Sequence, residues 1–203
     1  MSTQSQQIIS PEEPLSEQTL ARLDEAAAVL RKGGVIVCPT EGIYGLSAMA
    51  DNKEAIERII AIKKRNESKG LIVVISDMEM LNAVADIEAL EPGARVMAEQ
   101  LWPGHVTIVL PVKAGINPLI TGEHDTVAVR LTAFPLLREL CRRTGGAIVS
   151  TSANISGQSP LSKVEELHDA FDDLVDYVLE EPCQGLNRPS LVIEGRSGNI
   201  LRS

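Results

Sequence analysis

The sequence predicts an α/β fold built on a twisted, mixed β-sheet flanked by helices. Segments typical of short strands alternate along the chain with segments at helical spacing, and neither a long linker nor an internal repeat divides it. With 203 residues, 44% of them hydrophobic, the chain can bury one substantial core but is short for two. We therefore expect a flexible tail over residues 1–16 and a single domain over residues 17–203.

The N-terminal part of the domain is expected to contain two helices with one strand between them. Leucine and alanine recur at helical spacing over residues 20–30, and a glycine pair ends that helix. The apolar run VIVCP is a buried strand, and the loop TEGIYG follows, in which two glycines permit turns closed to other residues. A second helix runs from about Asn52, capped by Asp51, to about Lys64.

The rest of the chain continues this alternation. Apolar runs predict strands at LIVVI, VTIVLPV, TVAVRLT and AIVSTSAN, and shorter ones at VDYVL, SLVIE and NILR. Helices are expected over residues 78–85, 91–101 and 135–143. A capping box of Ser162 and Glu165 begins one more helix.

Composition indicates a soluble, cytoplasmic protein. No run of about 18 apolar residues could span a membrane, and the polar start MSTQSQQ lacks the basic and apolar regions of a secretory signal. The three cysteines are widely spaced, with no CxxC pair and no histidine at metal-ligand spacing. We expect reduced thiols and no protein-held metal.

Charge is distributed unevenly. The net charge of -9 argues against a generally basic nucleic-acid binder, because phosphate neutralisation supplies most non-specific affinity. Basic residues nevertheless gather over residues 53–69, whereas acidic residues gather over residues 165–181. An anionic ligand should bind at the basic segment.

Three cations suggest a phosphate site. The apolar stripe of the second helix would continue at residue 63, where Lys63 stands instead, so its ammonium must reach a cleft or a partner. Alternatively, Lys63 is favoured by the helix C-terminal dipole and extends to water. Arg65 and Lys69 follow within a short loop, and three convergent cations suit a polyphosphate as well as a solvated charge run. Since the chain has neither GxxxxGK[ST] nor GxGxxG, side chains must hold any phosphate.

Two further segments carry candidate ligand residues. The strand period places Thr126 and Arg130 on one face about 13 Å apart, which suits the two ends of an elongated ligand, although a surface arginine fits equally well. The same period places Ser150, Ser152 and Asn154 on one side. Their hydroxyl and amide groups could bind phosphate or an amino acid, and turn or cap duties would also explain them.

Six segments in order resemble the YrdC-like threonylcarbamoyl-AMP synthase family over about residues 20–202. They are PTEGIYGL, IKKRNESKGLIVV, LWPGHVTIVLP, TVAVRLT with FPL after it, IVSTSANISG and PSLVIE. The resemblance implies a twisted α/β sheet with a basic concave cavity. It corresponds to the short, single-domain form of the family.

The resemblance also implies roles for eleven residues. Lys63, Arg65 and Lys69 match the family's phosphate-binding KxRxxxK motif, and the first two would be catalytic by steadying the phosphates. Further ATP contacts are implied at Thr126, Ser152, Asn154 and Arg202. Threonine contacts are implied at Thr40, Arg130, Ser150 and Ser190.

Three positions depart from many relatives. Lys69 stands where asparagine is common, and a glycine of PTEGIYGL stands where threonine is common. Val74 stands where histidine is common, which removes one expected threonine contact.

The implied reaction joins L-threonine and bicarbonate as a carbamate, which attacks the α-phosphorus of ATP and releases pyrophosphate, with Mg²⁺ bridging the phosphates. The implied partner is the complex that transfers threonylcarbamoyl to tRNA. Two alternatives remain open: a carbamoyl-adenylate-forming carbamoyltransferase, and an RNA-binding module of ribosome maturation with weak affinity for tRNA.

Overall fold

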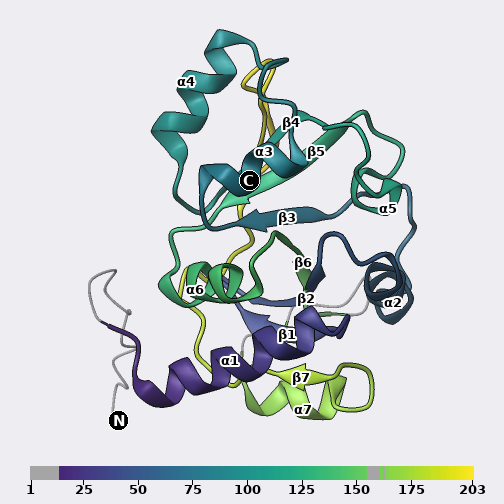
Figure 1. Cartoon of the computed structure of the whole chain (residues 1–203), viewed down its shortest axis with the longest axis vertical. Helices are drawn as coiled ribbons and strands as arrows, with labels where there is room; N and C mark the ends of the chain where they lie inside the picture. The colour runs from purple at the N-terminus through teal and green to yellow at the C-terminus, as the bar shows by residue number, and fades with distance from the viewer. Residues whose placement is uncertain (1–13, 155–160, 162) are drawn as a thin grey trace.

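The computed structural model describes residues 14–154, 161 and 163–203 and confirms the mixed α/β fold (Figure 1). Within these described residues, nine strands form one sheet in the order β7-β1-β2-β6-β3-β5-β4-β8-β9. The strands are β1 (Ile36–Pro39), β2 (Tyr44–Met49), β3 (Ile72–Ile75), β4 (Val106–Pro111), β5 (Thr126–Leu131), β6 (Ile148–Ser152), β7 (Tyr177–Val178), β8 (Leu191–Glu194) and β9 (Ile200–Arg202). The helices are α1 (Glu17–Arg31), α2 (Lys53–Lys63), α3 (Met78–Val84), α4 (Pro92–Leu101), α5 (Pro118–Thr121), α6 (Pro135–Thr144) and α7 (Glu165–Phe171).

Side-chain caps begin several of these helices. The Ser16 hydroxyl accepts a hydrogen bond from the Thr19 amide at the start of α1, which coincides with the predicted end of the tail. Residues 1–13 of that tail lie outside the described residues. In α2 the cap is Asn52, not the predicted Asp51, because the Asn52 side chain accepts from the Ala55 amide.

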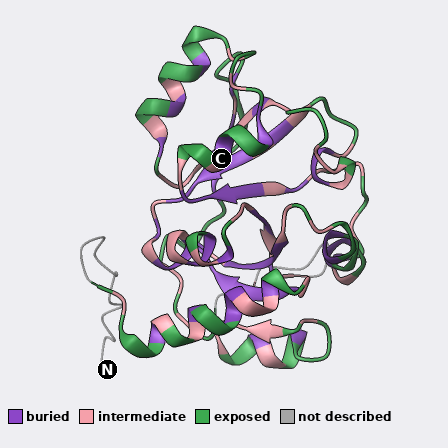
Figure 2. Cartoon of the chain, viewed as in Figure 1, coloured by how far each residue is buried: buried purple, intermediate pink, exposed green. Residues whose placement is uncertain are grey.

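The two faces of the sheet carry separate apolar clusters. Helices α1 and α6 lie side by side over one face, where they cover Ile36, Cys38, Val74 and Ile148 (Figure 1). The neighbouring residues of each strand point to the other face, where they meet α2, α3 and α7. Figure 2 shows the resulting pattern, with the central strands of the sheet largely buried and the outer sides of the helices exposed.

Strand β2 was not predicted. The sequence suggested a loop through residue 45, but β2 starts at Tyr44 and pairs between β1 and β6. Its glycine and serine positions obscured the alternation of buried apolar residues.

The two glycines of this segment, one before β2 and one within it, also act differently from the prediction, because neither has a positive φ. A Cβ at Gly42 would lie 1.8 Å from the Arg188 carbonyl oxygen, and one at Gly45 would lie 2.7 Å from Ser150 Oγ. These glycines therefore permit close packing of chain segments rather than special turns.

Helix α5 was likewise missed, since four residues are too short to show a helical period. Ser162 of the predicted capping box lies outside the described residues. Helix α7 begins with Val164 at its N-cap and no side-chain hydrogen bond there. In the described part of the chain, no helix combines the length and apolar character needed to cross a bilayer.

Candidate active site

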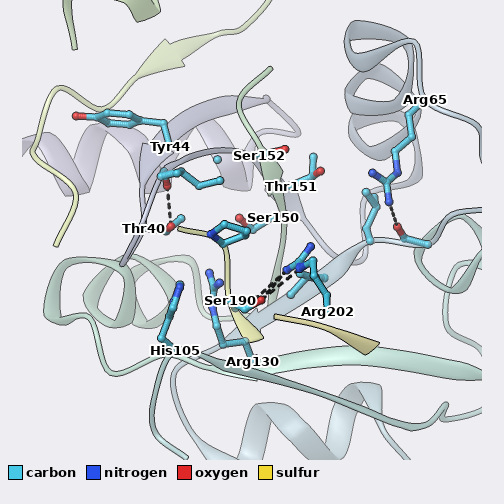
Figure 3. A pocket seen from close by; sticks show the side chains of 16 residues that line it. Thr40, Tyr44, Arg65, His105, Arg130, Ser150, Thr151, Ser152, Ser190 and Arg202 are labelled. Carbon is cyan, nitrogen blue, oxygen red and sulfur yellow. Dashed lines mark hydrogen bonds between the residues drawn. The ribbon is translucent and has the colours of Figure 1, made fainter. Parts of the chain in front are cut away.

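A polar cavity of about 220 Å³ opens beside the middle of the sheet (Figure 3). Its walls come from β2, β3, β5, β6 and β9, from the segment after β1, and from the loops that follow α2 and precede β4 and β8. Seven of the eleven predicted site residues line it: Thr40, Arg65, Arg130, Ser150, Ser152, Ser190 and Arg202. These residues are spread over 163 positions of the sequence, from 40 to 202, and the fold brings them together.

A second cavity of about 610 Å³ adjoins the first across residues 70–72, which line both. It contains two more of the predicted residues, Lys69 and Thr126. Thr126 and Arg130 thus lie on one face of β5, with Thr126 in the second cavity and Arg130 in the first. An elongated ligand that runs along the strand would contact both residues.

Lys63 lies behind the wall of the first cavity. Its side chain is 2% exposed, so the alternative of a lysine extending to water is wrong. Its ammonium donates to the backbone oxygens of Ser152 at 2.6 Å and Asn154 at 2.9 Å, and to Asn154 Oδ1 at 2.8 Å. Lys63 therefore joins the end of α2 to the end of β6, where the remaining predicted residue, Asn154, also lies.

The surroundings of Lys63 lower the pKa of its ammonium group. Burial, and secondarily the charge of Arg65, lowers the pKa of Lys63 to about 8. An anion bound nearby would reverse this effect by favouring the ammonium form.

Arg65 holds the loop after α2 through hydrogen bonds to its backbone. Its Nη2 donates to the carbonyl oxygens of Lys69 at 2.6 Å and Gly70 at 2.9 Å, while its side chain lines the cavity. Burial lowers the pKa of Arg65 as well. The predicted phosphate motif is therefore divided: Lys63 supports the wall, Arg65 lines the first cavity and Lys69 lines the second.

Arg202 and Ser190 form one unit in the cavity wall (Figure 3). Arg202 donates from Nη2 to the Ser190 carbonyl at 3.0 Å and to Ser190 Oγ at 3.2 Å. Ser190 Oγ is in turn 2.8 Å from Thr107 Oγ1. Burial, together with the charges of Arg130 and Arg65, lowers the pKa of Arg202, so these three arginines lie close enough to influence one another.

Arg130 is 5% exposed and lines the cavity, so the alternative of a surface arginine is wrong. Its Nη2 lies 3.4 Å from Oε2 of Glu41, a carboxylate that is itself 1% exposed. Burial would raise the pKa of Glu41, but Arg130, His105 and Thr132 outweigh it and lower this pKa to about 2. Glu41 is therefore a buried anion at neutral pH.

Sequence reasoning missed both Glu41 and His105. His105 lines the cavity beside Arg130, and its Nε2 lies 3.0 Å from the Arg188 carbonyl oxygen. Both residues occupy loops within PTEGIYGL and LWPGHVTIVLP, where no periodicity marks a side chain as buried. The only available signal was an ionisable residue inside an otherwise apolar motif.

The fold and the cavity define an α/β protein whose site suits a small anionic ligand with hydrogen-bonding groups. The chain belongs to the Sua5/YciO/YrdC family, since that family's model, described as "Telomere recombination", matches residues 28–203. A threonylcarbamoyl-AMP synthase of Stenotrophomonas maltophilia is 40% identical over 181 residues, which are 89% of this chain and 97% of that protein.

Solved structures agree with this assignment. The Sua5 protein of P. abyssi, solved in complex with L-threonine, is 31% identical with a TM-score of 0.81. The match covers 90% of this chain and 52% of that longer chain. YciO of E. coli shares the fold with a TM-score of 0.79 at 24% identity, over 94% of this chain and 92% of that one.

Proposed function

We propose that this protein is a threonylcarbamoyl-AMP synthase, which makes threonylcarbamoyl-AMP and pyrophosphate from L-threonine, bicarbonate and ATP. The observation that carries the proposal is the convergence of seven predicted ligand residues in one cavity. The name of the Stenotrophomonas relative and the threonine complex of the P. abyssi relative support it.

The threonine end of the site is assigned to the first cavity. The Arg130 guanidinium receives the substrate carboxylate, because a planar guanidinium can donate two parallel hydrogen bonds to it. Thr40, Ser150 and Ser190 line the same cavity and offer small hydroxyl groups for the amine and hydroxyl of threonine.

The nucleotide end is assigned to the boundary of the two cavities. Arg65 and Arg202 on one side and Lys69 and Thr126 on the other can follow an extended triphosphate along the shared wall. ATP would enter as its Mg²⁺ complex, with the ion held by phosphate oxygens. The protein's part is to position the carbamate oxygen in line with the α-phosphorus and to neutralise charge as pyrophosphate leaves.

Lys63 gives this proposal a pH signature. With a pKa of about 8, its amine is neutral in about half of the free molecules at pH 8, and nearby phosphates favour the ammonium form. ATP binding at pH 8 should therefore take up about half a proton, and binding at pH 7 distinctly less. Calorimetry in two buffers of different ionisation enthalpy measures this uptake. If the heat of ATP binding at pH 8 is the same in both buffers, no proton is taken up, and Lys63 is not close to the bound phosphates.

Release of pyrophosphate tests the substrate set. It should require threonine and bicarbonate together, since neither alone supplies the carbamate nucleophile. Serine should be used about 5-fold or more less efficiently, because a pocket that buries the threonine methyl gains about 1 kcal/mol from it. Equal rates with the two amino acids would show that this pocket does not recognise the methyl group.

Binding of RNA is expected to be weak and sensitive to salt. A chain of net charge -9 offers phosphates little besides its arginine-lined cavity, so affinity for tRNA should disappear by about 200 mM salt. A filter-binding titration at several salt concentrations measures this. Tight binding that persists there would favour the RNA-binding alternative.

The proposed product is a reactive mixed anhydride, so it must be used in the compartment where it is made, which we propose is the cytoplasm. Its proposed consumer is the complex that transfers threonylcarbamoyl to tRNA.

A further inference from the structure

Three buried polar atoms without hydrogen-bond partners among the described residues meet at the edge of the first cavity. They are Glu41 Oε2, His105 Nδ1 and Arg130 Nε. Glu41 Oε2 lies 3.4 Å from Arg130 Nη2 and 3.8 Å from His105 Nδ1, so one carboxylate oxygen faces two nitrogen-bearing side chains. Buried polar atoms normally find partners, and a cluster of three that do not is a feature to be explained.

Glu41 differs from the other two members because it does not line the cavity, whereas Arg130 and His105 do. It is 1% exposed, and its second oxygen, Oε1, accepts a 2.6 Å hydrogen bond from Thr132 Oγ1. Thr132 is fully buried, and its hydroxyl also accepts from the Phe134 amide. The carboxylate is thus fixed from behind by a residue that is out of reach of any ligand.

The ion pair with Glu41 explains how the charged side chain of Arg130 can remain buried in the cavity wall. A guanidinium that is 5% exposed needs a counter-charge, and Glu41 supplies it from behind the cavity wall. The unpaired Arg130 Nε is then a donor that still lacks an acceptor. His105 is held at its far nitrogen by the Arg188 carbonyl, two residues before Ser190.

We propose that Glu41, fixed by Thr132, is a positioning residue that holds Arg130 and His105 in the cavity wall, where Arg130 receives the carboxylate of the amino-acid substrate. This inference rests on the proposed function and deepens it by assigning the recognition of one substrate group. Glu41 itself does not touch the substrate.

The test compares Glu41→Gln with the wild type. Glutamine keeps the shape and can still accept from Thr132, but it loses the charge that orients Arg130. The KM for threonine should rise at least about 10-fold, whereas the KM for ATP should change less than about twofold. A threonine KM within about twofold of the wild type, or equal rises in both KM values, would overturn the inference.

A second pair of variants keeps the test decisive if Glu41→Gln does not fold. Thr132→Val removes the hydrogen bond to Glu41 and should raise the threonine KM about 3-fold or more, whereas Thr132→Ser, which retains the hydroxyl, should restore it. A merely structural role would change both substrate requirements in Thr132→Val. That result, or an unchanged threonine KM, counts against the inference.

Wild-type controls separate this inference from the proposed function. Wild-type protein that releases no pyrophosphate with all three substrates refutes the function. Titration of L-threonine by calorimetry then still tests the positioning role, since Glu41→Gln should weaken threonine binding by about the same factor as the predicted rise in KM. Unchanged affinity would refute the positioning role by itself.

Discussion

Lys63→Ala is expected to lower the rate of pyrophosphate release by about 100-fold or more. Lys63 is the buried cation behind the proposed phosphate site, and its ammonium also holds the turn after β6 through the backbone oxygens of Ser152 and Asn154. Alanine removes the charge and releases that turn. It also removes the ammonium's hydrogen bonds to these half-buried carbonyls, so the free energy of unfolding should fall by about 1–3 kcal/mol.

Lys64→Ala is the matched control. Lys64 is exposed at the left-handed C-cap of α2 and lines neither cavity, so its loss should be nearly silent. Steady-state rates and chemical unfolding curves of both variants decide the question. Normal turnover by correctly folded Lys63→Ala would remove Lys63 from the mechanism.

Arg130→Lys is expected to raise the KM for threonine about 10- to 100-fold, with a much smaller effect on the KM for ATP. Lysine keeps the positive charge but loses the planar, two-point contact with a carboxylate, and one charge-assisted hydrogen bond contributes about 1.5–3 kcal/mol. The shorter reach of the ammonium in a wall shaped for a guanidinium adds to the loss.

Varying each substrate at saturation of the others measures the two KM values separately. Arg143→Lys is a suitable control, because Arg143 forms its ion pairs with Asp24 and Glu139, away from both cavities. If Arg130→Lys lost affinity for ATP and kept its affinity for threonine, the two ends of the site would have to be exchanged.

Most of the helices and strands were predictable because local sequence patterns determine them. Helix α3 has Asp77 as its cap, and α6 ends at Gly145 with a positive φ, as a glycine after a helix indicates. The order of strands was not predictable. Strand β6 lies between β2 and β3, and Ser150 pairs with Ser47 and Ile72, contacts that join distant parts of the chain and leave no trace in local periodicity.

The candidate site follows the same division. Lys63 was identified because a lysine interrupts an apolar stripe, and Arg130 because it shares a strand face with Thr126. Glu41 could not be found in this way, since its partners Arg130 and Thr132 lie about 90 positions away. Val74, where the resemblance implied a histidine, is fully buried in the cluster under α6 and lines neither cavity, while His105 supplies an imidazole to the first cavity from the loop before β4.

The most direct test of the central claim is to incubate the purified protein with ATP, L-threonine and ¹³C-bicarbonate and to analyse the nucleotide products by mass spectrometry. A threonylcarbamoyl-AMP synthase should form one new adenylate that contains threonine and is one mass unit heavier with the labelled bicarbonate, together with pyrophosphate. An adenylate without the label, or conversion of ATP to ADP and phosphate, would contradict it.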